Sequence, residues 1–330
     1  MCTRLTLQGD KQGNSYQGVW CYYSGIKDSL TQVNCDGVFL KLLDYSNHVL
    51  KFYHNIMSMN SVIDSKEELR KFTEQYIVPQ EHDKKKLAAV FTPEILAVEM
   101  LDKIPGYIWE NKNLKWLESS NGVGHFSLQV YHRLYSSLKE EIPNNVERKK
   151  HIFENMLYFV EINKEYNDIF KSVVGNDFKL NLYEGDFLSF NSKKEMNVLS
   201  FDIIYGNPPY QRENKKSGVA RGGKGNLYID FVKKSLELLS TNGHLLFIHP
   251  PNWRKIGSQI FKEFLTRDLI YLSINYGGKF FKSVSVKTDF YLLRNSKSGI
   301  ETQVEYFFNK KKHVNKLTVG ERITFIPNIF

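Results

Sequence analysis

The sequence predicts an α/β fold built on a mainly parallel sheet, and two recurring patterns support that prediction. Short apolar runs, each of the length of a buried strand, end at turns that carry Gly, Pro or an acidic residue. Amphipathic helices follow some of these turns, with apolar residues three or four positions apart. The chain of 330 residues is long enough for one large domain and an accessory piece.

Residues 1–80 are predicted to be an N-terminal accessory region of uncertain fold. Its eight basic and eight acidic side chains cancel, so the net charge of +9 lies in the rest of the chain. Ser65 and Glu68 have the spacing of a capping box and predict a helix start. A polar linker over 78–86 then leads to the predicted main domain, residues 81–295. Several aromatic residues of the accessory region indicate a packed or protein-binding piece: Tyr16, Trp20, Tyr22 and Tyr23.

A strand, an acidic residue and a glycine turn follow one another between Leu114 and Phe126. Gly122 and Gly124 would let the backbone approach a ligand closely. The turn lacks the third glycine of a dinucleotide-binding loop and the Gly-Lys-Ser/Thr of a phosphate-binding loop. Because Glu118 stands just before it, we expect a ligand that carries an ammonium group rather than phosphates. The following helix presents one apolar face: Leu128, Tyr131, Leu134 and Leu138.

Two later strands also end at residues suited to a nucleoside. The run 156–160 ends at Glu161, where such folds commonly hold the two ribose hydroxyls. After the strand 180–183, Asp186 offers an acceptor for an adenine amine and Phe187 offers a stacking surface. Each acid alone also fits a helix cap or a solvated strand end, but acids at successive strand ends favour a binding site.

The most informative segment is Asn-Pro-Pro-Tyr, residues 207–210, at the end of the apolar run 201–206. The two prolines stop the strand and have no N–H, so their carbonyls can face a cleft at the carboxyl edge of the sheet. The Asn207 side-chain oxygen and the Pro208 carbonyl could accept both hydrogens of a planar amine, which favours attack by its nitrogen on a methyl group. Tyr210 would stack on the heterocycle. Taken alone, the tetrapeptide also fits a proline-rich turn with an Asn cap.

With these motifs in this order, the chain resembles DNA adenine-N6 methyltransferases of the gamma motif order from about Lys84 to Leu293. It is most similar to the methylase modules of combined restriction-modification enzymes and to the modification methylases of large DNA viruses. The resemblance implies a Rossmann-like, S-adenosylmethionine-dependent methyltransferase fold, with a mainly parallel seven-stranded sheet and helices on both faces. It also implies direct in-line transfer of a methyl group to N6 of a flipped-out adenine in DNA.

By resemblance, S-adenosylmethionine is the cofactor. Glu118 would bind its amino group and Glu161 its ribose. The element Phe91-Thr92-Pro93, which opens a predicted helix over 94–104, would close over its methionine end; Thr92 is the predicted N-cap of that helix and Pro93 its first residue. Ser119 departs from the proline that the family often places after the acid. The full predicted set of cofactor-binding residues is Thr92, Glu118, Gly122, Gly124, Glu161, Asp186 and Phe187.

The resemblance also assigns the residues that act on the substrate. Asn207, Pro208, Pro209 and Tyr210 form the catalytic segment, and Tyr210 with Phe281 would enclose the target base. His125 and His249 read as structural residues. The segment 211–226 carries a net charge of +4 and is predicted to contact DNA phosphates, although basic loops are also often plain solvated surface. Its basic residues are Arg212, Lys215, Lys216, Arg221 and Lys224.

The remaining chain is predicted to continue the domain and then extend it. A helix over 227–239 and a strand over 243–249 match the family's order, as does a strand over 289–293. Residues 296–330 are predicted to be a short strand-rich extension, interpreted as the start of a truncated recognition region. Lys310, Lys311 and Lys312 either touch phosphate or form a hairpin turn between strands over 304–308 and 317–325.

We therefore predict a site-specific DNA adenine-N6 methyltransferase of a restriction-modification system. RNA adenine-N6, protein glutamine and cytosine-N4 methyltransferases remain alternatives, and a non-catalytic DNA-binding or specificity partner is an alternative of another class. The expected partner is DNA, and a separate recognition or endonuclease domain or subunit stays open. Three cysteines without metal-ligand spacing predict no metal site, and the absence of a long apolar stretch predicts a soluble intracellular protein with no membrane contact.

Overall fold

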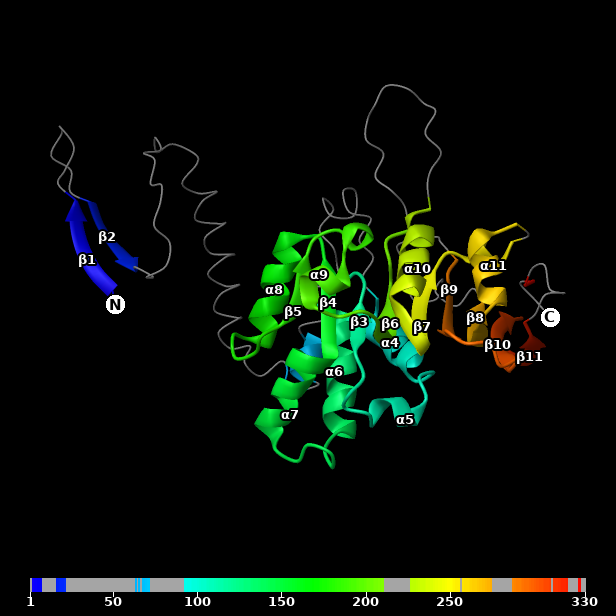
Figure 1. The fold of residues 1–330 in the computed structure, drawn as a ribbon. Coiled ribbons are helices and arrows are strands. Elements are labelled where there is room, and N and C mark those ends of the chain that lie inside the picture. The colour runs from blue at the N-terminus through cyan, green and yellow to red at the C-terminus, as the bar shows by residue number, and fades with distance from the viewer. Residues whose placement is uncertain are drawn as a thin grey trace, which may run out of the picture. The chain divides into compact units, whose positions relative to one another are not determined.

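The structure is a computed structural model that describes residues 2–7, 16–21, 63, 65, 67–71, 92–210, 226–255, 257–274, 287–309, 311–319 and 326–327. It divides into two compact units, Met1–His54 and Asn55–Phe330. In the first unit, β1 (Cys2–Leu7) pairs in antiparallel register with β2 (Tyr16–Cys21), both blue in Figure 1. The division of the chain into functional domains stays a prediction.

The second unit is built on a nine-stranded sheet with the order β11-β10-β8-β9-β7-β6-β3-β4-β5 (Figure 1). Five of its strands run parallel: β3 (Trp116–Glu118), β4 (Leu157–Glu161), β5 (Asn181–Glu184), β6 (Phe201–Gly206) and β7 (Leu239–His249). β9 (Asp289–Arg294) runs antiparallel between β7 and β8 (Asp268–Ile274). The seven neighbouring strands β8-β9-β7-β6-β3-β4-β5 form the predicted mainly parallel, seven-stranded sheet.

Two further strands correct the predicted strand count. β10 (Glu301–Phe308) adds in parallel to β8, and β11 (Lys311–Thr318) pairs with β10 in antiparallel register. Asn309, with a φ of 49°, lies between the paired residues Phe308 and Lys311. A hairpin therefore forms here, but its second strand begins at Lys311 and not at residue 317, so Lys311 and Lys312 lie in the strand and not in the turn. Contact of these lysines with phosphate stays a prediction.

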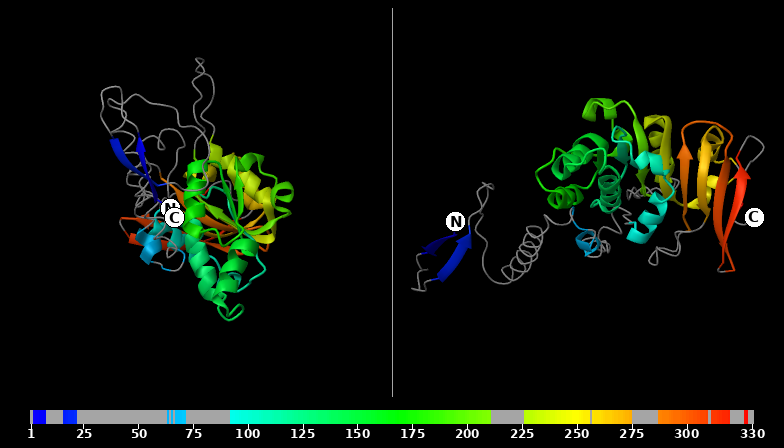
Figure 2. Two further views of the ribbon diagram at one scale, coloured as in Figure 1. Left: turned by 90° about the vertical axis from the view of Figure 1, so that its left-hand side faces the viewer. Right: turned by 90° about the horizontal axis from the view of Figure 1, so that it is seen from below.

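Helices flank the sheet on both faces (Figure 2). The described helices are α4 (Glu94–Leu101), α5 (Gly106–Trp109), α6 (His125–Ser137), α7 (Asn145–His151), α8 (Lys164–Val174), α9 (Ser192–Met196), α10 (Leu227–Leu238) and α11 (Gln259–Leu265). Single turns of other helix types are η2 (Ile152–Met156), η3 (Phe187–Ser189) and η4 (Pro251–Arg254). None of these helices is both long and apolar enough to cross a membrane.

The helix boundaries follow local chemistry. Asn144 and Asn163 each accept two backbone N–H groups and so cap α7 and α8. The Ser65 Oγ accepts the Glu68 N–H at 3.4 Å, which supplies one half of the predicted capping box. The Thr92 prediction was off by one residue, because Pro93 is the N-cap of α4 and has no side-chain acceptor to offer. This helix also ends at Leu101, earlier than predicted.

The core explains why the strands read as continuous apolar runs. Every residue of β4 is buried, as expected for a parallel strand covered on both faces. The largest fully buried side chains include Trp116 of β3 and Trp253 of η4. Burial of one such side chain contributes about 1.5–3 kcal/mol. The central strands are thereby held rigidly, and their carboxyl ends with them.

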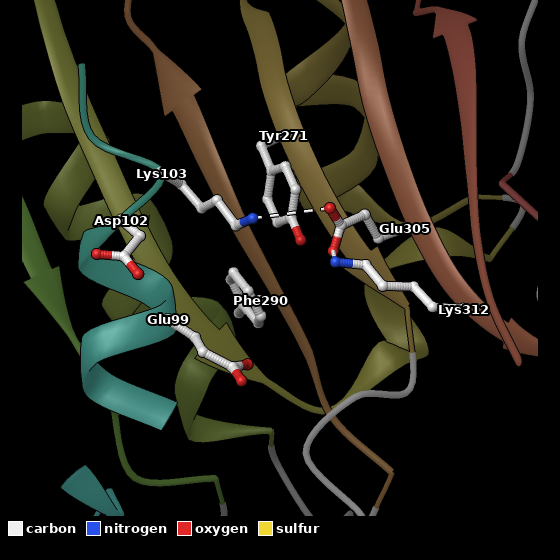
Figure 3. A pocket seen from close by; sticks show the side chains of 7 residues that line it. All are labelled: Glu99, Asp102, Lys103, Tyr271, Phe290, Glu305 and Lys312. Atoms are coloured by element: carbon white, nitrogen blue, oxygen red, sulfur yellow. Dashed lines mark ion pairs between the residues drawn. The ribbon is translucent and has the colours of Figure 1, made fainter. Parts of the chain in front are cut away.

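The C-terminal hairpin is fastened to the sheet through Glu305 of β10 (Figure 3). Its carboxylate lies 2.7 Å from the Lys312 Nζ of β11 and 3.7 Å from the Lys103 Nζ that follows α4. Burial acts to raise the pKa of Glu305, but hydrogen bonds from Lys312 and Tyr271 and the charge of Lys103 outweigh it, so the pKa is lowered. Together with these four side chains, three others line the pocket of Figure 3: Glu99, Asp102 and Phe290.

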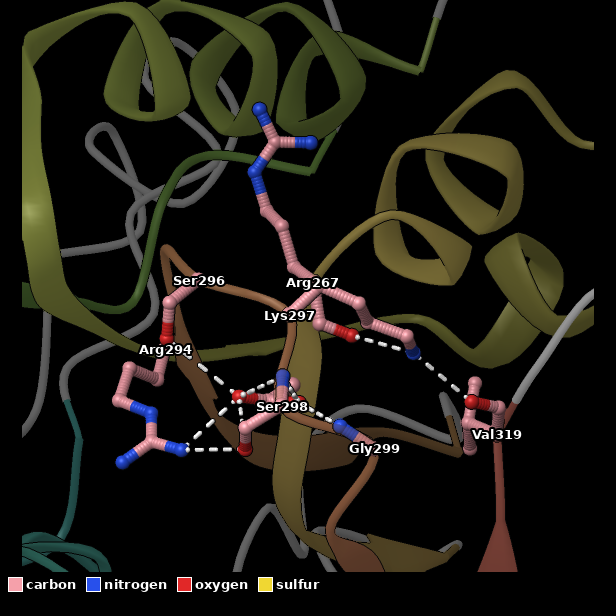
Figure 4. Close-up of polar contacts among 8 residues, drawn as sticks. Arg267, Arg294, Ser296, Lys297, Ser298, Gly299 and Val319 are labelled. Carbon is pink, nitrogen blue, oxygen red and sulfur yellow. Dashed lines mark hydrogen bonds and ion pairs between the residues drawn. The ribbon is translucent and has the colours of Figure 1, made fainter.

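Asp268, the first residue of β8, organises the turn between β9 and β10; Figure 4 labels its partners Arg294, Ser298 and Gly299. The Arg294 NH2 donates to its carboxylate at 2.9 Å, and the Ser298 N–H and hydroxyl donate at 2.9 Å each. The Gly299 N–H adds a contact of 3.2 Å. Burial acts against the charge, but these donors outweigh it and lower the pKa of Asp268. The Asp268 carboxylate therefore receives its hydrogen bonds from residues of the same chain.

Candidate active site

The predicted site residues meet because the topology places their strands side by side. β6, β3, β4 and β5 are consecutive neighbours in the sheet and run parallel, so their carboxyl ends share one edge. Backbone hydrogen bonds join the segments that leave this edge: Ser119 N–H to the Tyr205 carbonyl, and Asn121 N–H to the Val160 carbonyl. Ligands of open α/β sheets bind at such an edge.

Glu118 ends β3 and is 3% exposed. Burial raises its pKa well above the usual range, the charge of Glu161 raises it further, and a hydrogen bond with Ser127 opposes the shift. No Lys, Arg or His of the described residues forms an ion pair with it. A buried carboxyl group without a cation is costly to ionise, which makes this position receptive to a positively charged ligand.

Ser127, in the first turn of α6, is the centre of a buried hydrogen-bond cluster. Its hydroxyl forms a very short contact with the Glu118 Oε2 and lies 2.7 Å from the Asn121 Oδ1. The Tyr205 hydroxyl of β6 lies 3.2 Å away. Burial, followed by the charge of Glu118, raises the pKa of Tyr205 well above its usual range, so its hydroxyl stays protonated.

Sequence reasoning missed Ser127 and Tyr205. Tyr205 reads as a core residue of an apolar strand, and Ser127 stands one turn beyond the glycines in a helix judged by its apolar face. The available signal was a hydroxyl in the first helical turn after a glycine turn, on the side that faces the strand-end acid.

Glu161 ends β4 and is tied down by the backbone. Its Oε2 accepts the Gly122 N–H at 2.7 Å, and its Oε1 accepts the Asn163 N–H at 2.8 Å. Burial raises the pKa of Glu161, and the hydrogen bonds from these N–H groups oppose that shift. The Ile162 N–H also donates to this carboxylate, which has about four lone-pair sites, so the group is oriented and can still accept a hydroxyl donor.

Gly124 is required by packing as well as by backbone conformation. Its φ is +92°, and a Cβ there would stand 2.3 Å from a ring carbon of Phe170 in α8. Gly122 also has a positive φ, of 55°. The turn therefore brings backbone, and not side chain, to the space between Glu118 and Glu161.

The two residues predicted to bind adenine differ in exposure, because Asp186 is exposed and Phe187 is buried. Asp186 is exposed and caps η3 by accepting the Leu188 N–H at 3.0 Å, which leaves acceptor capacity on its carboxylate. The Phe187 ring is 2% exposed and packs against Phe231 of α10 at a centroid distance of 5.0 Å. Ile162, directly after Glu161, is 63% exposed and offers an apolar surface at the same edge. Stacking of adenine on Phe187 stays a prediction.

The catalytic segment is joined directly to the glycine turn. The Ser120 Oγ donates to the Asn207 carbonyl at 3.2 Å. Gly206 has a φ of 148°, and a Cβ there would lie 3.4 Å from the Ser119 Oγ. Burial raises the pKa of the Tyr210 hydroxyl, against a hydrogen bond with Asn207. The Tyr210 carbonyl accepts the Leu227 N–H at 3.1 Å, where α10 begins.

Several predicted residues fall outside the described part of the chain. They are Phe281 and the basic residues Arg212, Lys215, Lys216, Arg221 and Lys224. Thr92, which precedes the N-cap Pro93 of α4, is buried. Its contact with the cofactor, like the roles of the others, remains a prediction.

The two histidines predicted to be structural are both buried. Burial lowers the pKa of His249 to about 4 and that of His125 to about 3. His249 stacks on Tyr228 with ring centroids 4.5 Å apart, and its Nε2 lies 3.0 Å from the Tyr291 hydroxyl. Because the Nδ1 lies 3.1 Å from the Pro250 carbonyl, which can only accept, the neutral ring carries its proton on Nδ1.

The site fits a cofactor that has an ammonium group, a ribose and an adenine. Glu118 supplies a buried acidic group that pairs with no cation of the described residues, Glu161 an oriented acceptor, and Asp186 an exposed acceptor at the next strand end. Among the described residues, no group of three or more His, Cys, Asp or Glu side chains is placed to hold a metal ion.

Within the seven strands from β8 to β5, only β9 is antiparallel, and acids end β3 and β4. This strand order and these acids define a fold of the S-adenosylmethionine-dependent methyltransferase class. The cofactor of this class is S-adenosylmethionine. The family model described as Eco57I restriction-modification methylase matches residues 112–281, more than half of the chain. The chain belongs to the Eco57I restriction-modification methylase family.

Relatives of known name agree with this family. The "Uncharacterized adenine-specific methylase" of Mycoplasma pneumoniae is 24% identical over 316 residues, 72% of this chain and 74% of that protein. The type II methyltransferase M.BstVI of Geobacillus stearothermophilus is 28% identical over 191 residues, which are 50% of this chain but only 34% of the relative. The chain thus matches about a third of the length of that methyltransferase.

Among solved structures, the type IIL restriction-modification enzyme MmeI in complex with DNA has a TM-score of 0.54 at 11% identity. The likeness covers 72% of this chain and 41% of that one, and at this identity it shows the fold alone. Both that enzyme and M.BstVI are larger than the part that this chain matches.

Proposed function

We propose that the chain transfers the methyl group of S-adenosylmethionine to N6 of adenine in DNA. One observation carries the proposal: the hydrogen bond from the Ser120 hydroxyl to the Asn207 carbonyl ties the catalytic segment to the turn that follows Glu118. A group bound at Asn207 therefore lies next to a group bound at Glu118. The family, and the adenine-specific relative, support adenine as the methyl acceptor.

The chain's own residues account for the chemistry at the amine. Bound S-adenosylmethionine supplies an electrophilic methyl group on a sulfonium sulfur. The Asn207 side-chain oxygen and the Pro208 carbonyl accept the two amine hydrogens and hold the nitrogen lone pair toward that methyl group. A nitrogen–carbon bond forms as the carbon–sulfur bond breaks, and the amine proton leaves to solvent. The thioether leaves neutral, so the site needs no acid catalyst.

Tyr210 would give the target base a face to stack on. A base inside a duplex must be rotated out before its amine can reach Asn207, at a cost of a few kcal/mol. Stacking on Tyr210 and contacts of the basic residues in 211–226 with phosphates would offset that cost. A recognition element on another domain or subunit is part of the proposal, because M.BstVI extends well beyond the matched region.

The test is the Asn207→Ala variant with labelled S-adenosylmethionine and DNA, followed by nucleoside analysis. We expect label in N6-methyladenine with the unaltered protein, and a loss of at least about a thousandfold with the variant, while cofactor affinity is kept. Asn252→Ala is the matched control, because this exposed Asn follows the second Pro-Pro pair, at the end of the neighbouring strand β7. Full transfer by Asn207→Ala would refute the mechanism.

The same experiment separates the alternative substrates. RNA and a protein extract replace DNA in parallel reactions with the unaltered chain. Label in RNA adenine or in protein glutamine would overturn the DNA assignment and keep the site, because an amide also presents two N–H donors. Label at cytosine N4 would overturn the assignment of adenine as the target base and keep DNA as the substrate.

A further inference from the structure

The hydrogen-bond cluster around Ser127 has more acceptors than its hydrogens can serve if Glu118 is ionised. Ser127 carries one hydroxyl hydrogen, and two oxygens approach it as acceptors: the Glu118 Oε2, in very short contact, and the Asn121 Oδ1 at 2.7 Å. With Glu118 ionised, the hydrogen goes to Glu118, and the Asn121 oxygen then faces the serine oxygen with no hydrogen between them.

Rotating the Asn121 amide would bring its Nδ2 to the Ser127 oxygen and remove this conflict, but it moves the problem to the Gly122 carbonyl. In the observed orientation its Nδ2 faces the Gly122 carbonyl at 3.5 Å. A rotated amide would turn its oxygen toward that carbonyl and place two acceptors against each other. The observed orientation is therefore the better one, and it needs a second hydrogen at the contact between Ser127 and Glu118.

A proton on Glu118 satisfies every member of the cluster. The carboxylic acid donates to the Ser127 Oγ, and the Ser127 hydroxyl donates to the Asn121 Oδ1. The Tyr205 hydroxyl, 3.2 Å away, donates to the second lone pair of the Ser127 oxygen. Within the described part of the chain, the groups that face Glu118 are thus Ser127 of α6, Tyr205 of β6 and, through its charge, Glu161 of β4, and none of these is a cation.

We propose that Ser127, held by Asn121 and Tyr205, positions Glu118 as a neutral acid in the cofactor-free protein, and that cofactor binding releases this proton to solvent. The inference rests on the proposed function, since it takes the ligand's ammonium group as the partner of Glu118. The Glu118 O–H bond breaks, the proton passes to buffer, and the carboxylate forms an ion pair with the ammonium. Ser127 then turns its hydrogen from Asn121 to Glu118. Ser127 is a positioning residue, because it acts through Glu118.

Isothermal titration calorimetry of the full chain in buffers of different ionisation enthalpy counts the protons. We expect about one proton released for each S-adenosylmethionine or S-adenosylhomocysteine bound, since both carry the ammonium group. 5′-Methylthioadenosine keeps the nucleoside but lacks the ammonium, so it should release none. Affinity for the first two ligands should rise about tenfold per pH unit wherever the free protein holds the proton and the amino group of the free ligand, with a pKa of about 7.7–8.0, stays charged.

Variants separate positioning from a general structural effect. Glu118→Gln should bind S-adenosylhomocysteine more weakly and release no proton. Ser127→Ala should bind it about tenfold more weakly near neutral pH and shift proton release to higher pH, because the ionised acid loses its donor. Ser127→Thr keeps a hydroxyl and should restore the profile, and Tyr205→Phe should change it in the same direction as Ser127→Ala, by less.

Ser136→Ala is the matched control on the same helix, because the Ser136 hydroxyl bonds only to the His132 carbonyl among the contacts described, at 2.9 Å. It should leave both affinity and proton release unchanged. Tight binding of S-adenosylhomocysteine by the unaltered chain without proton release between pH 6 and 7, where the amino group of the free ligand is still charged, overturns the inference. An unaltered profile in Ser127→Ala overturns the role of Ser127.

A measurement without any ligand separates this inference from the proposed function. A group whose pKa is raised on folding stabilises the protein below its unfolded pKa, and that stability is lost as the pH rises through the folded pKa. Glu118→Gln should therefore gain stability over the unaltered chain as the pH rises. If no cofactor binds, the proposed function fails, but this pH dependence still decides whether Glu118 is protonated. A difference in unfolding free energy between the two proteins that does not change with pH would refute a protonated Glu118.

Discussion

Two buried carboxyl groups at the same edge of the sheet are treated in opposite ways. Asp289, the first residue of β9, receives the Arg254 Nε at 2.6 Å and the Trp253 Nε1 at 3.0 Å. Glu118, at the end of β3, receives a serine hydroxyl and, among the described residues, no cation. The first acid is neutralised by the fold. The difference indicates that the β7–β9 half of this edge is structural and the β3–β4 half is left for a ligand.

The Asp289 side of the edge joins three parts of the chain. Besides Asp289, the Arg254 guanidinium reaches the carbonyls of Ile326 and Pro327 at 2.9 and 3.0 Å. The Ile326 N–H returns a bond to the Arg254 carbonyl at 3.3 Å. Asp268, at the opposite edge, shows the same treatment, with several donors around one carboxylate (Figure 4).

The largest effect on stability is expected from breaking the buried ion pair between Arg254 and Asp289. Arg254→Met leaves the charge of Asp289 buried without its cation, and we expect unfolding to become easier by about 3–5 kcal/mol in urea titrations. The double variant Arg254→Met, Asp289→Leu should recover part of that loss. Lys164→Met is the control, because its pair with Asp168 is exposed and should contribute under about 0.5 kcal/mol. A loss in Arg254→Met as small as that of the control would contradict the structural role.

A smaller effect is expected at Asp268. Asp268→Asn removes charge-assisted hydrogen bonds and should cost about 2 kcal/mol at neutral pH. Because the pKa of Asp268 is lowered on folding, its contribution is present above the unfolded value of about 3.9 and is lost as the pH falls through the folded value. The difference between the two proteins should therefore shrink in acid. A difference that stays constant to pH 3 would contradict this assignment.

The smallest effect on stability is expected at Glu161, which lies between the two extremes. Glu161→Gln loses one of two acceptors for backbone N–H groups but also removes a buried charge, so the net change should stay within about 1 kcal/mol. Cofactor affinity should fall more clearly, because the ribose loses a charged acceptor. Fluorescence or calorimetric titration with S-adenosylhomocysteine measures this. A large loss of stability with unchanged cofactor affinity would show that Glu161 has a structural role and not a ligand-binding one.

The parts predicted well from the sequence are those that depend on local order. Glu118, Glu161 and Asp186 each stand at a strand end, and parallel strands bring such ends to one edge whatever the details of packing. Asn207 was predicted because two prolines make its turn recognisable, and its catalytic role stays a prediction. The mainly parallel sheet followed from the same apolar runs.

The parts missed depend on pairs distant in sequence. Arg254 and Asp289 are 35 positions apart and are ordinary residues in their own segments. Tyr205 contributes its ring to the core and its hydroxyl to the site, and a hydrophobicity pattern reports only the ring. The ninth strand depends on β10 adding in parallel to β8, a pairing that no local signal in Glu301–Phe308 specifies.

Because the sheet extends to β11, this strand is the outermost described strand at that end of the sheet and can contact other molecules. A strand at the edge of a sheet offers unpaired N–H and C=O groups to any passing chain. Here the outermost strand among the described residues carries exposed Lys311, Lys312 and Lys316. Lys312 and Lys316 pair with Glu305 and Glu301 of β10, and lysines along an edge strand disfavour its pairing with another strand. At the other end, β5 is only four residues long. The sheet can therefore be wide without recruiting further strands into aggregates.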